Sequence, residues 1–257
     1  MHDANPEPGP FDHFLDEGLI EHVIRPIKSG KEASVHLCRA NPRTTGHDLL
    51  ALKAYHPLNR RDFRDESMYR DGEWIKPRRV RVALEKKTTF GRQVQGSLWV
   101  NREWETLRAL SEGNVSIPAP IERTEDAILM TYIGDRGAPA PRLHEYGWDD
   151  REELEALWER IHDCLEHMLY RDVVHGDLSA YNVLVWDGEV VVIDFPQAVD
   201  PKKNRHAAAF LERDVRRIGQ WFEHQGLHLP WEQIAEDLWT AWTFADLVPE
   251  ELRGLTI

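Results

Sequence analysis

The sequence predicts an α+β fold with two lobes: a small antiparallel sheet in the N-terminal half and mainly helices in the C-terminal half. Between Ile20 and Ala54, short segments with β-branched residues alternate with turns, which is typical of antiparallel strands. After residue 142, apolar side chains recur every three or four positions, which is typical of helices with one buried face. A loop containing glycine and proline, Met130 to Arg142, separates the two halves.

The N-terminal half is expected to contain three strands before its first long helix. Turn-forming residues at Ser29 to Lys31 and at Asn41 to Gly46 separate these strands. The strands themselves are expected at Val23-Ile24, Val35 to Leu37 and Leu49 to Leu52. Helical spacing of apolar residues then predicts a helix over Leu98 to Leu110, and Ala127 to Ile133 is expected to form another strand.

The C-terminal half is expected to contain three helices and one hairpin. Asp149 and Asp150 are suitable caps for a helix that continues to Met168. Two short apolar runs, Val183 to Trp186 and Val190 to Ile193, are joined by Asp187-Gly188, the dipeptide most typical of a two-residue hairpin turn. The other two helices are expected over Ala207 to Phe222 and Trp231 to Leu247.

The composition fits an ordinary globular protein of 257 residues, with 41% hydrophobic and 30% charged residues. Only Cys38 and Cys164 are present, without a CxxC pair, so neither a disulfide framework nor a cysteine zinc site is expected. We therefore expect a cytoplasmic protein. No apolar run is longer than a strand, so no membrane segment is expected.

The chain carries a net charge of -13, which argues against a protein that coats nucleic acid with its whole surface. A basic island nevertheless lies between Lys76 and Arg92, where Glu85 is the only acidic residue. Two interpretations stay open: a solvated surface segment, or a segment that contacts RNA, a protein substrate or phosphates.

The strongest indication of function is His175-Gly176-Asp177-Leu178-Ser179-Ala180-Tyr181-Asn182, followed after the hairpin by Ile193-Asp194-Phe195. Phosphoryl transfer from ATP requires a carboxylate that orients the accepting hydroxyl and oxygen ligands that hold magnesium. Asp177 is the candidate for the first role, and Asn182 and Asp194 are the candidate metal ligands. Their order and spacing match the HxDxxxxN and DFG motifs of protein-kinase-like enzymes.

The N-terminal half then has a defined role. A lysine on the third strand of kinases binds the phosphates that are not transferred, and a helix glutamate holds that lysine in place. Lys53, in Ala51-Leu52-Lys53, has the expected position. Glu103 is the best-placed glutamate, with Glu105 as the alternative.

Together these segments resemble the RIO family of atypical serine/threonine protein kinases, in the form without an N-terminal winged-helix domain. The resemblance covers roughly Phe11 to Phe222. Its matching segments are Ser29 to Val35 (SGKEASV), Met130 to Leu143 (MTYIGDRGAPAPRL), His175 to Asn182 (HGDLSAYN), Ile193 to Gln197 (IDFPQ) and Phe210 to Asp214 (FLERD). It implies a single RIO-type kinase domain over residues 1–257, with an N-lobe over about 11–130, a hinge over about 130–142 and a C-lobe over about 143–257.

The resemblance implies ATP as the nucleotide and Mg2+ as the metal, with Mn2+ as a substitute. Apolar walls with a few polar edge contacts suit an adenine pocket. The phosphate loop has only Gly30, so side chains of Ser29 and Lys31 are expected to assist it. The residues expected to contact the nucleotide are Ile27, Ser29, Lys31, Val35, Ala51, Lys53, Glu103, Met130, Thr131, Ile133, Leu184 and Ile193.

The chain departs from ordinary serine/threonine kinases beside its expected catalytic aspartate. Those enzymes usually carry a lysine two residues after that aspartate, whereas this chain has Ser179. One positive charge near the transferring phosphoryl group is therefore missing. Asp214, on an expected helix, is a candidate acceptor of hydrogen bonds from the catalytic-loop backbone, with a surface salt bridge as the alternative.

Three functions are consistent with these residues. The resemblance favours a serine protein kinase or ATPase, and some family members act as ATPases in maturation of the small ribosomal subunit, so a protein or ribosomal particle is the expected partner. It also places a flap over Asn59 to Gly96, which contains the basic island. His-Gly-Asp-Leu occurs as well in aminoglycoside and choline phosphotransferases, which are the second candidate class. A nucleotide-binding switch that organises an assembly is the third.

Overall fold

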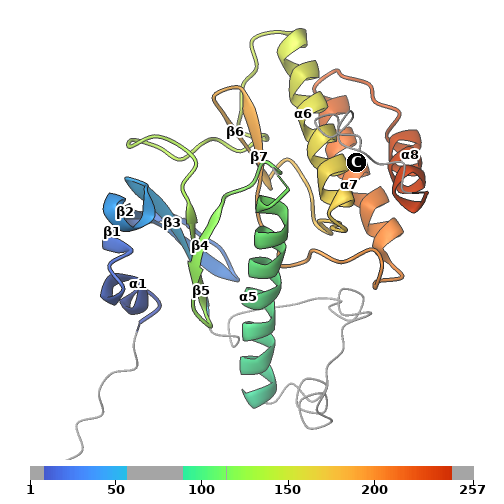
Figure 1. Ribbon diagram of the computed structural model, residues 1–257. Coiled ribbons are helices and arrows are strands. Elements are labelled where there is room, and N and C mark those ends of the chain that lie inside the picture. The colour runs from blue at the N-terminus through green and yellow to red at the C-terminus, as the bar shows by residue number, and fades with distance from the viewer. Residues whose placement is uncertain (1–8, 57–88, 114, 245–257) are drawn as a thin grey trace, which may run out of the picture. The chain divides into compact units, whose positions relative to one another are not determined.

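The computed structural model describes residues 9–56, 89–113 and 115–244 of the protein (Figure 1). These residues form two compact units. The first holds residues 9–56, 89–104 and 119–139, and the second holds residues 105–113, 115–118 and 140–244. No helix in the described ranges is long and apolar enough to cross a membrane.

The first unit is built on a five-stranded antiparallel sheet with the strand order β1-β2-β3-β5-β4. Its strands are β1 (Ile20–Ser29), β2 (Ala33–Ala40), β3 (Leu49–Tyr55), β4 (Pro120–Arg123) and β5 (Ala127–Thr131). The three strands expected before residue 55 and the later strand are confirmed, although β5 ends two residues earlier than expected. Strand β4 was not expected; it begins with a proline at the sheet edge, where a missing backbone donor costs no ladder hydrogen bond.

One face of this sheet packs against the short helix α1 (Asp12–Asp16), which was also not expected from the sequence. Phe14 of α1 is fully buried and belongs to the same core as the inward residues of the sheet. That core contains Phe14, Ile20, Cys38, Ala40, Leu50, Leu52, Ala54, Ala127 and Leu129. Because side chains alternate along a strand, the intervening residues of β2, β3 and β5 point to the opposite face.

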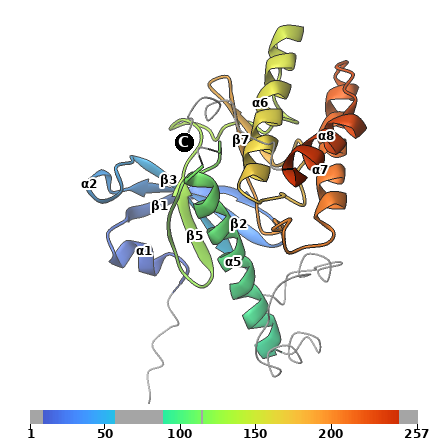
Figure 2. The ribbon, with the colours of Figure 1, turned by 45° about the vertical axis from the view of Figure 1, so that its right-hand side comes forward.

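Helix α5 (Thr89–Ser111) lies beside the sheet in both views (Figures 1 and 2). It extends beyond the expected helix Leu98 to Leu110 at its N-terminal end. Trp99, Val100 and Glu103 are buried, and Glu103 lies three residues after Val100 and four after Trp99, which are the spacings of one helical face. The expected turn after Asn41 is the short helix α2 (Pro42–Thr45), whose Asn41 side chain accepts a hydrogen bond from the Arg43 amide.

The second unit contains α6 (Arg151–Tyr170), α7 (Ala207–His224), α8 (Trp231–Thr243) and the hairpin of β6 (Val183–Trp186) and β7 (Glu189–Val192). Helix α8 contacts both α6 and α7, and Figure 1 shows the three helices grouped together. The Asp150 carboxylate caps α6 by accepting a hydrogen bond from the Glu153 amide. Of the expected helix Trp231 to Leu247, residues 245–247 lie outside the described ranges.

The hairpin turn has the geometry that its sequence predicts. Trp186 pairs with Glu189, so only Asp187 and Gly188 form the loop. Both have positive φ, 53° and 77°, as a type I′ turn requires. This turn fixes the register of β6 and β7, and it thereby sets the spacing between Asn182 before the hairpin and Asp194 after it.

Candidate active site

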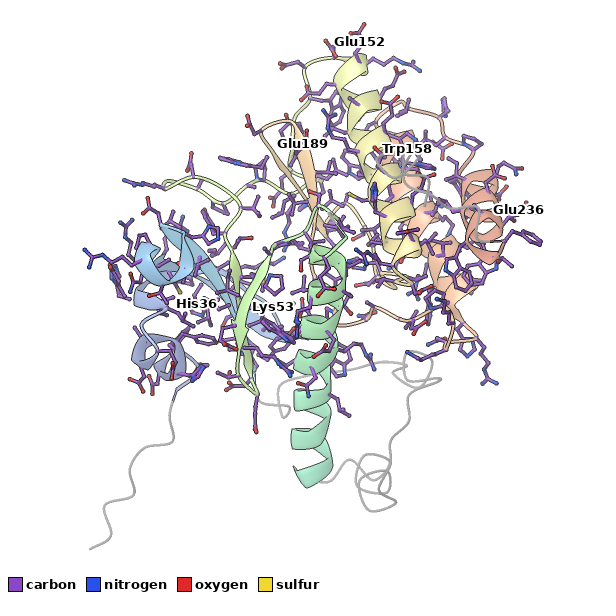
Figure 3. All side chains as sticks on the ribbon, viewed as in Figure 1. His36, Lys53, Glu152, Trp158, Glu189 and Glu236 are labelled. Carbon is purple, nitrogen blue, oxygen red and sulfur yellow. The ribbon has the colours of Figure 1, made fainter. Side chains whose placement is uncertain are left out.

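Lys53 and Glu103 form an ion pair in the first unit. Lys53 Nζ lies 2.8 Å from each carboxylate oxygen of Glu103. The side chains are 12% and 2% exposed, and Figure 3 shows Lys53 on the sheet next to α5. The pair contains Glu103 and not the alternative, Glu105, whose side chain is exposed. The sequence therefore predicted this pairing correctly.

The sheet register places several expected nucleotide-contacting residues on the same face as Lys53. Lys53 lies between Val35 on β2 and Ile128 on β5, and Ala51 lies between Leu37 and Met130. Directly paired residues of antiparallel strands share a face. Val35, Ala51 and Met130 therefore form an apolar surface beside the Lys53 ammonium group, which suits a base attached to phosphates.

The remaining expected contacts of the first unit lie at the ends of strands. Ile27 falls at a register irregularity of β1, so the pairing does not assign its side chain to a face. Ser29 ends β1 opposite Ser34, and Gly30 closes the following turn by donating its N–H to Ala33. Lys31 is exposed in that turn.

At the end of β5, the Thr131 amide donates a hydrogen bond to the Ala119 carbonyl at 2.9 Å. The Thr131 hydroxyl accepts one from the Ala119 amide at 2.8 Å. The amide and the hydroxyl oxygen of Thr131 therefore both take part in hydrogen bonds to Ala119. The Thr131 amide is not available for an edge contact to a base, whereas its carbonyl and the proton of its hydroxyl are not used by these two bonds. Ile133 follows the strand and is partly buried.

The loop of the second unit that contains Asp177 is held by Asp214 on α7. The Asp214 carboxylate accepts hydrogen bonds from the amides of Gly176, at 2.7 Å, and Leu178, at 3.0 Å. These two amides flank Asp177. The hydrogen-bonding role considered for Asp214 is therefore the one that the structure shows.

Two arginines on the same helix also reach this loop. Arg213 donates to the Gly176 carbonyl, and Arg217 Nη1 lies 2.6 Å from Asp177 Oδ1. Neither arginine was singled out from the sequence. Their spacing was a usable signal, because Arg217 lies three residues after Asp214 and four after Arg213, and residues at these spacings share a helical face.

His175 links the loop that contains Asp177 to the segment after the hairpin. Its Nδ1 accepts a hydrogen bond from the Asp177 amide at 3.2 Å, and its Nε2 lies 3.1 Å from the Ile193 carbonyl. Together these contacts assign the Nε2–H tautomer, since Nδ1 accepts and a carbonyl cannot donate. The ring also packs against Phe195, with 4.8 Å between centroids. His175 is thus a structural residue beneath the loop.

The two candidate metal ligands lie on neighbouring segments. The Asn182 carbonyl accepts a hydrogen bond from the Ile193 amide at 2.9 Å, which joins the segment before the hairpin to the residue preceding Asp194. The Asn182 side-chain amide donates to the Asp177 carbonyl at 2.9 Å. Within the described residues its Oδ1 receives no hydrogen bond. That oxygen and the exposed Asp194 carboxylate are the ligand types that Mg2+ prefers, so these residues fit the metal.

Asp194 has an unusual backbone conformation, with φ of 75°. A non-glycine residue in this left-handed region costs energy, and such residues are concentrated at functional sites. Leu184, another expected nucleotide contact, lies on β6 opposite Val191 and is partly buried. Ile193 directly precedes Asp194 and is also partly buried.

Burial raises the pKa of Asp214 to about 7, from an ordinary value of 3.8, although the Gly176 and Leu178 amides and Arg213 favour its ionised form. Between these two pH values the folded chain binds more protons than the unfolded chain, so the free energy of unfolding falls as pH rises. We expect the melting temperature to decline from pH 5 to pH 8 more steeply in the wild type than in Asp214→Asn, which cannot titrate. Parallel pH profiles of the two proteins would contradict this assignment.

The basic island from Lys76 to Arg92 cannot be placed by the structure. Residues 76–88 lie outside the described ranges, and the side chains of residues 89–92 are likewise not described. Contact between this island and RNA stays a prediction from the sequence. The same holds for the flap expected over Asn59 to Gly96.

The sequence profile that defines the RIO domain matches residues 38–234. The chain belongs to the RIO family. It is 31% identical over 224 residues to the RIO-type serine/threonine-protein kinase Rio1 of Haloferax volcanii, covering 87% of this chain and 71% of that protein. It is 30% identical over 224 residues to serine/threonine-protein kinase RIO1 of Chaetomium thermophilum, covering 84% of this chain but only 42% of that protein. RIO proteins with these names are phosphotransferases, the enzyme class that the sequence predicts.

A solved RIO structure has a similar fold. The Rio2 kinase-ADP/Mg2+-phosphoaspartate complex from Chaetomium thermophilum matches with a TM-score of 0.62 and 18% sequence identity. The match covers 95% of this chain and 71% of the other. This likeness confirms the α+β, protein-kinase-like fold class expected from the sequence.

Proposed function

We propose that this RIO protein is an ATP- and Mg2+-dependent phosphotransferase that uses Asp177 to orient the nucleophile. The observation that carries this proposal is the restraint around Asp177, whose neighbouring amides are both held by Asp214. A general base must be positioned within hydrogen-bond reach of the proton it accepts. A loop whose backbone is fixed on both sides of Asp177 provides that positioning.

The proposed roles follow from the chemistry of each group. Lys53, held by Glu103, binds phosphates that are not transferred, while Val35, Ala51 and Met130 contact the base. Asn182 and Asp194 hold Mg2+, which neutralises phosphate charge when bound. Asp177 accepts the proton of a serine hydroxyl on a protein acceptor. A protein acceptor is proposed because the relatives are named serine/threonine-protein kinases.

Hydrolysis of ATP is the second candidate reaction. The Rio2 structure is described as a complex with ADP, Mg2+ and phosphoaspartate. An aspartyl phosphate that reacts with water returns the free enzyme and inorganic phosphate, so the net reaction is ATP hydrolysis. The groups proposed to bind the base, the phosphates and Mg2+ would serve either reaction, whereas an aspartate acceptor attacks as a carboxylate and brings no hydroxyl proton to Asp177.

The test is incubation of the purified protein with γ-labelled ATP, with Mg2+, with Mn2+ and with EDTA. We expect turnover only with a divalent cation. Label in free phosphate, with a hydroxylamine-sensitive label on the protein, would indicate ATPase chemistry through phosphoaspartate. Label on serine of an added ribosomal particle or protein would indicate a protein kinase, and label on an aminoglycoside or choline would indicate a small-molecule phosphotransferase. No turnover with any acceptor would reject the proposed function and favour a nucleotide-binding switch.

A further inference from the structure

The side chain of Arg217 lies at the carboxylate proposed to orient the nucleophile. Arg217 Nη1 is 2.6 Å from Asp177 Oδ1, and the two side chains are 42% and 41% exposed. Oδ2 of Asp177 accepts no hydrogen bond within the described part of the chain. One carboxylate oxygen therefore binds the guanidinium, and the other is available for a hydroxyl proton.

Support of the loop does not explain this contact. Asp214 and Arg213 already bind the backbone on either side of Asp177. Arg217 instead binds the Asp177 side chain, and a half-exposed ion pair of this kind contributes little to folding stability. The position of Arg217 is better explained by a role in the reaction proposed at Asp177.

The positive charge of Arg217 corresponds to the charge that is missing at Ser179. Ser179 occupies the position at which serine/threonine kinases usually carry a lysine. Arg217 brings a permanent cation to the same carboxylate from a different element, helix α7. A guanidinium has five N–H donors in a planar fork, and one of them binds Asp177 here.

We propose that Arg217 is a catalytic residue that bridges Asp177 and the transferring phosphoryl group, in place of the missing lysine. A hydroxyl on Asp177 Oδ2 would lie about 3 Å from the carboxylate and about 3–3.5 Å from phosphorus in the reactive geometry. A guanidinium on the other oxygen is then within reach of a phosphoryl oxygen. This inference rests on the proposed function.

The reaction at this site is balanced without a further reactant. The acceptor oxygen forms a bond to phosphorus, the bond from phosphorus to the bridging oxygen of ADP breaks, and the hydroxyl proton passes to Asp177. Arg217 keeps its proton throughout, because a guanidinium stays charged at any working pH. Its contribution is to stabilise the negative charge that the phosphoryl oxygens carry in the transition state.

The test compares Arg217→Ala and Arg217→Lys with Arg216→Ala. Arg216 is the neighbouring arginine on α7 and makes no polar contact within the described residues. Arg216→Ala therefore removes the same charge from a neighbouring position of the same helix. We expect Arg217→Ala to lower kcat about 10²-fold, with KM for ATP changed less than about threefold because ground-state binding is kept. Arg217→Lys should recover part of the loss, and Arg216→Ala should match the wild type.

Binding measurements separate contact with the phosphoryl group from loop support. Arg217→Ala should bind ADP with Mg2+ as the wild type does, but it should bind ADP with Mg2+ and aluminium fluoride, which mimics the transferring group, about 10²-fold more weakly. An equal loss for both ligands would overturn the proposal in favour of a structural role. Unchanged or faster turnover in Arg217→Ala would also overturn it, the latter indicating that Arg217 blocks Asp177. An inactive wild type would instead reject the proposed function, and this inference with it.

Discussion

Asp194→Asn is expected to reduce Mg2+-dependent ATP turnover by at least about 10³-fold while leaving the fold intact. A metal-bound carboxylate contributes several kcal/mol of transition-state stabilisation through the ion it holds, and about 4 kcal/mol corresponds to a factor of 10³. Asparagine tolerates the positive φ of residue 194 better than alanine does, so this variant removes the charge with little backbone strain. Steady-state turnover over a range of Mg2+ concentrations measures the effect.

Asp187→Asn is the matched control for this experiment. Asp187 also has positive φ, 53°, and is exposed in the hairpin turn between β6 and β7. Asp187→Asn removes the same charge at a position with the same left-handed backbone conformation, but Asp187 lies outside the proposed metal site. Turnover of Asp187→Asn should therefore equal that of the wild type. If both variants lose activity equally, or if Asp194→Asn keeps wild-type turnover, Asp194 is not a metal ligand.

The elements that sequence reasoning predicted are those with a strong local pattern. The Asp187-Gly188 turn requires two left-handed residues, and the Asp150 cap precedes an apolar helical repeat; both patterns are complete within a few residues. Strand β4 has no such pattern. Its four residues, Pro120–Arg123, are strand only because they pair with β5, and pairing partners cannot be deduced from so short a segment. Helix α1 is similarly short, and its Phe14 is stabilised by the sheet core.

The candidate site also contains contacts that the sequence predicts and contacts that depend on how distant elements pack. Lys53 and Glu103 are 50 positions apart, yet their pairing was predictable because a strand lysine and a helix glutamate have a known joint role. The contacts of Arg213 and Arg217 depend on how α7 is rotated against the loop that contains Asp177. That rotation follows from buried residues such as Phe210, Val215 and Phe222, and it places Asp214 and both arginines toward the loop. Sequence periodicity predicted the helix, and Asp214 was a predicted acceptor for the loop amides, but the contacts of the two arginines were not predicted.

Lys53→Met is expected to reduce both stability and activity, and a double variant should separate the two effects. Loss of Lys53 removes the cation that lies 2.8 Å from the Glu103 carboxylate, which is only 2% exposed. Breaking such a buried pair costs about 3–5 kcal/mol. Replacing both residues by methionine removes the uncompensated charge and retains similar volume, so the free energy of unfolding should return to within about 1–2 kcal/mol of the wild-type value. Chemical denaturation of the three proteins measures these differences.

Nucleotide turnover should not recover with stability in the Lys53→Met/Glu103→Met variant. The proposed role of Lys53 is to bind phosphates, and methionine cannot supply that charge, so the double variant should be as inactive as Lys53→Met. Lys202→Met is the control: Lys202 pairs with Asp172 in an exposed ion pair, so its loss should leave stability close to the wild-type value. Activity that returns together with stability would show that the pair only supports the fold. Persistent inactivity in a stable double variant would show that the charged pair is required for the reaction and not only for stability.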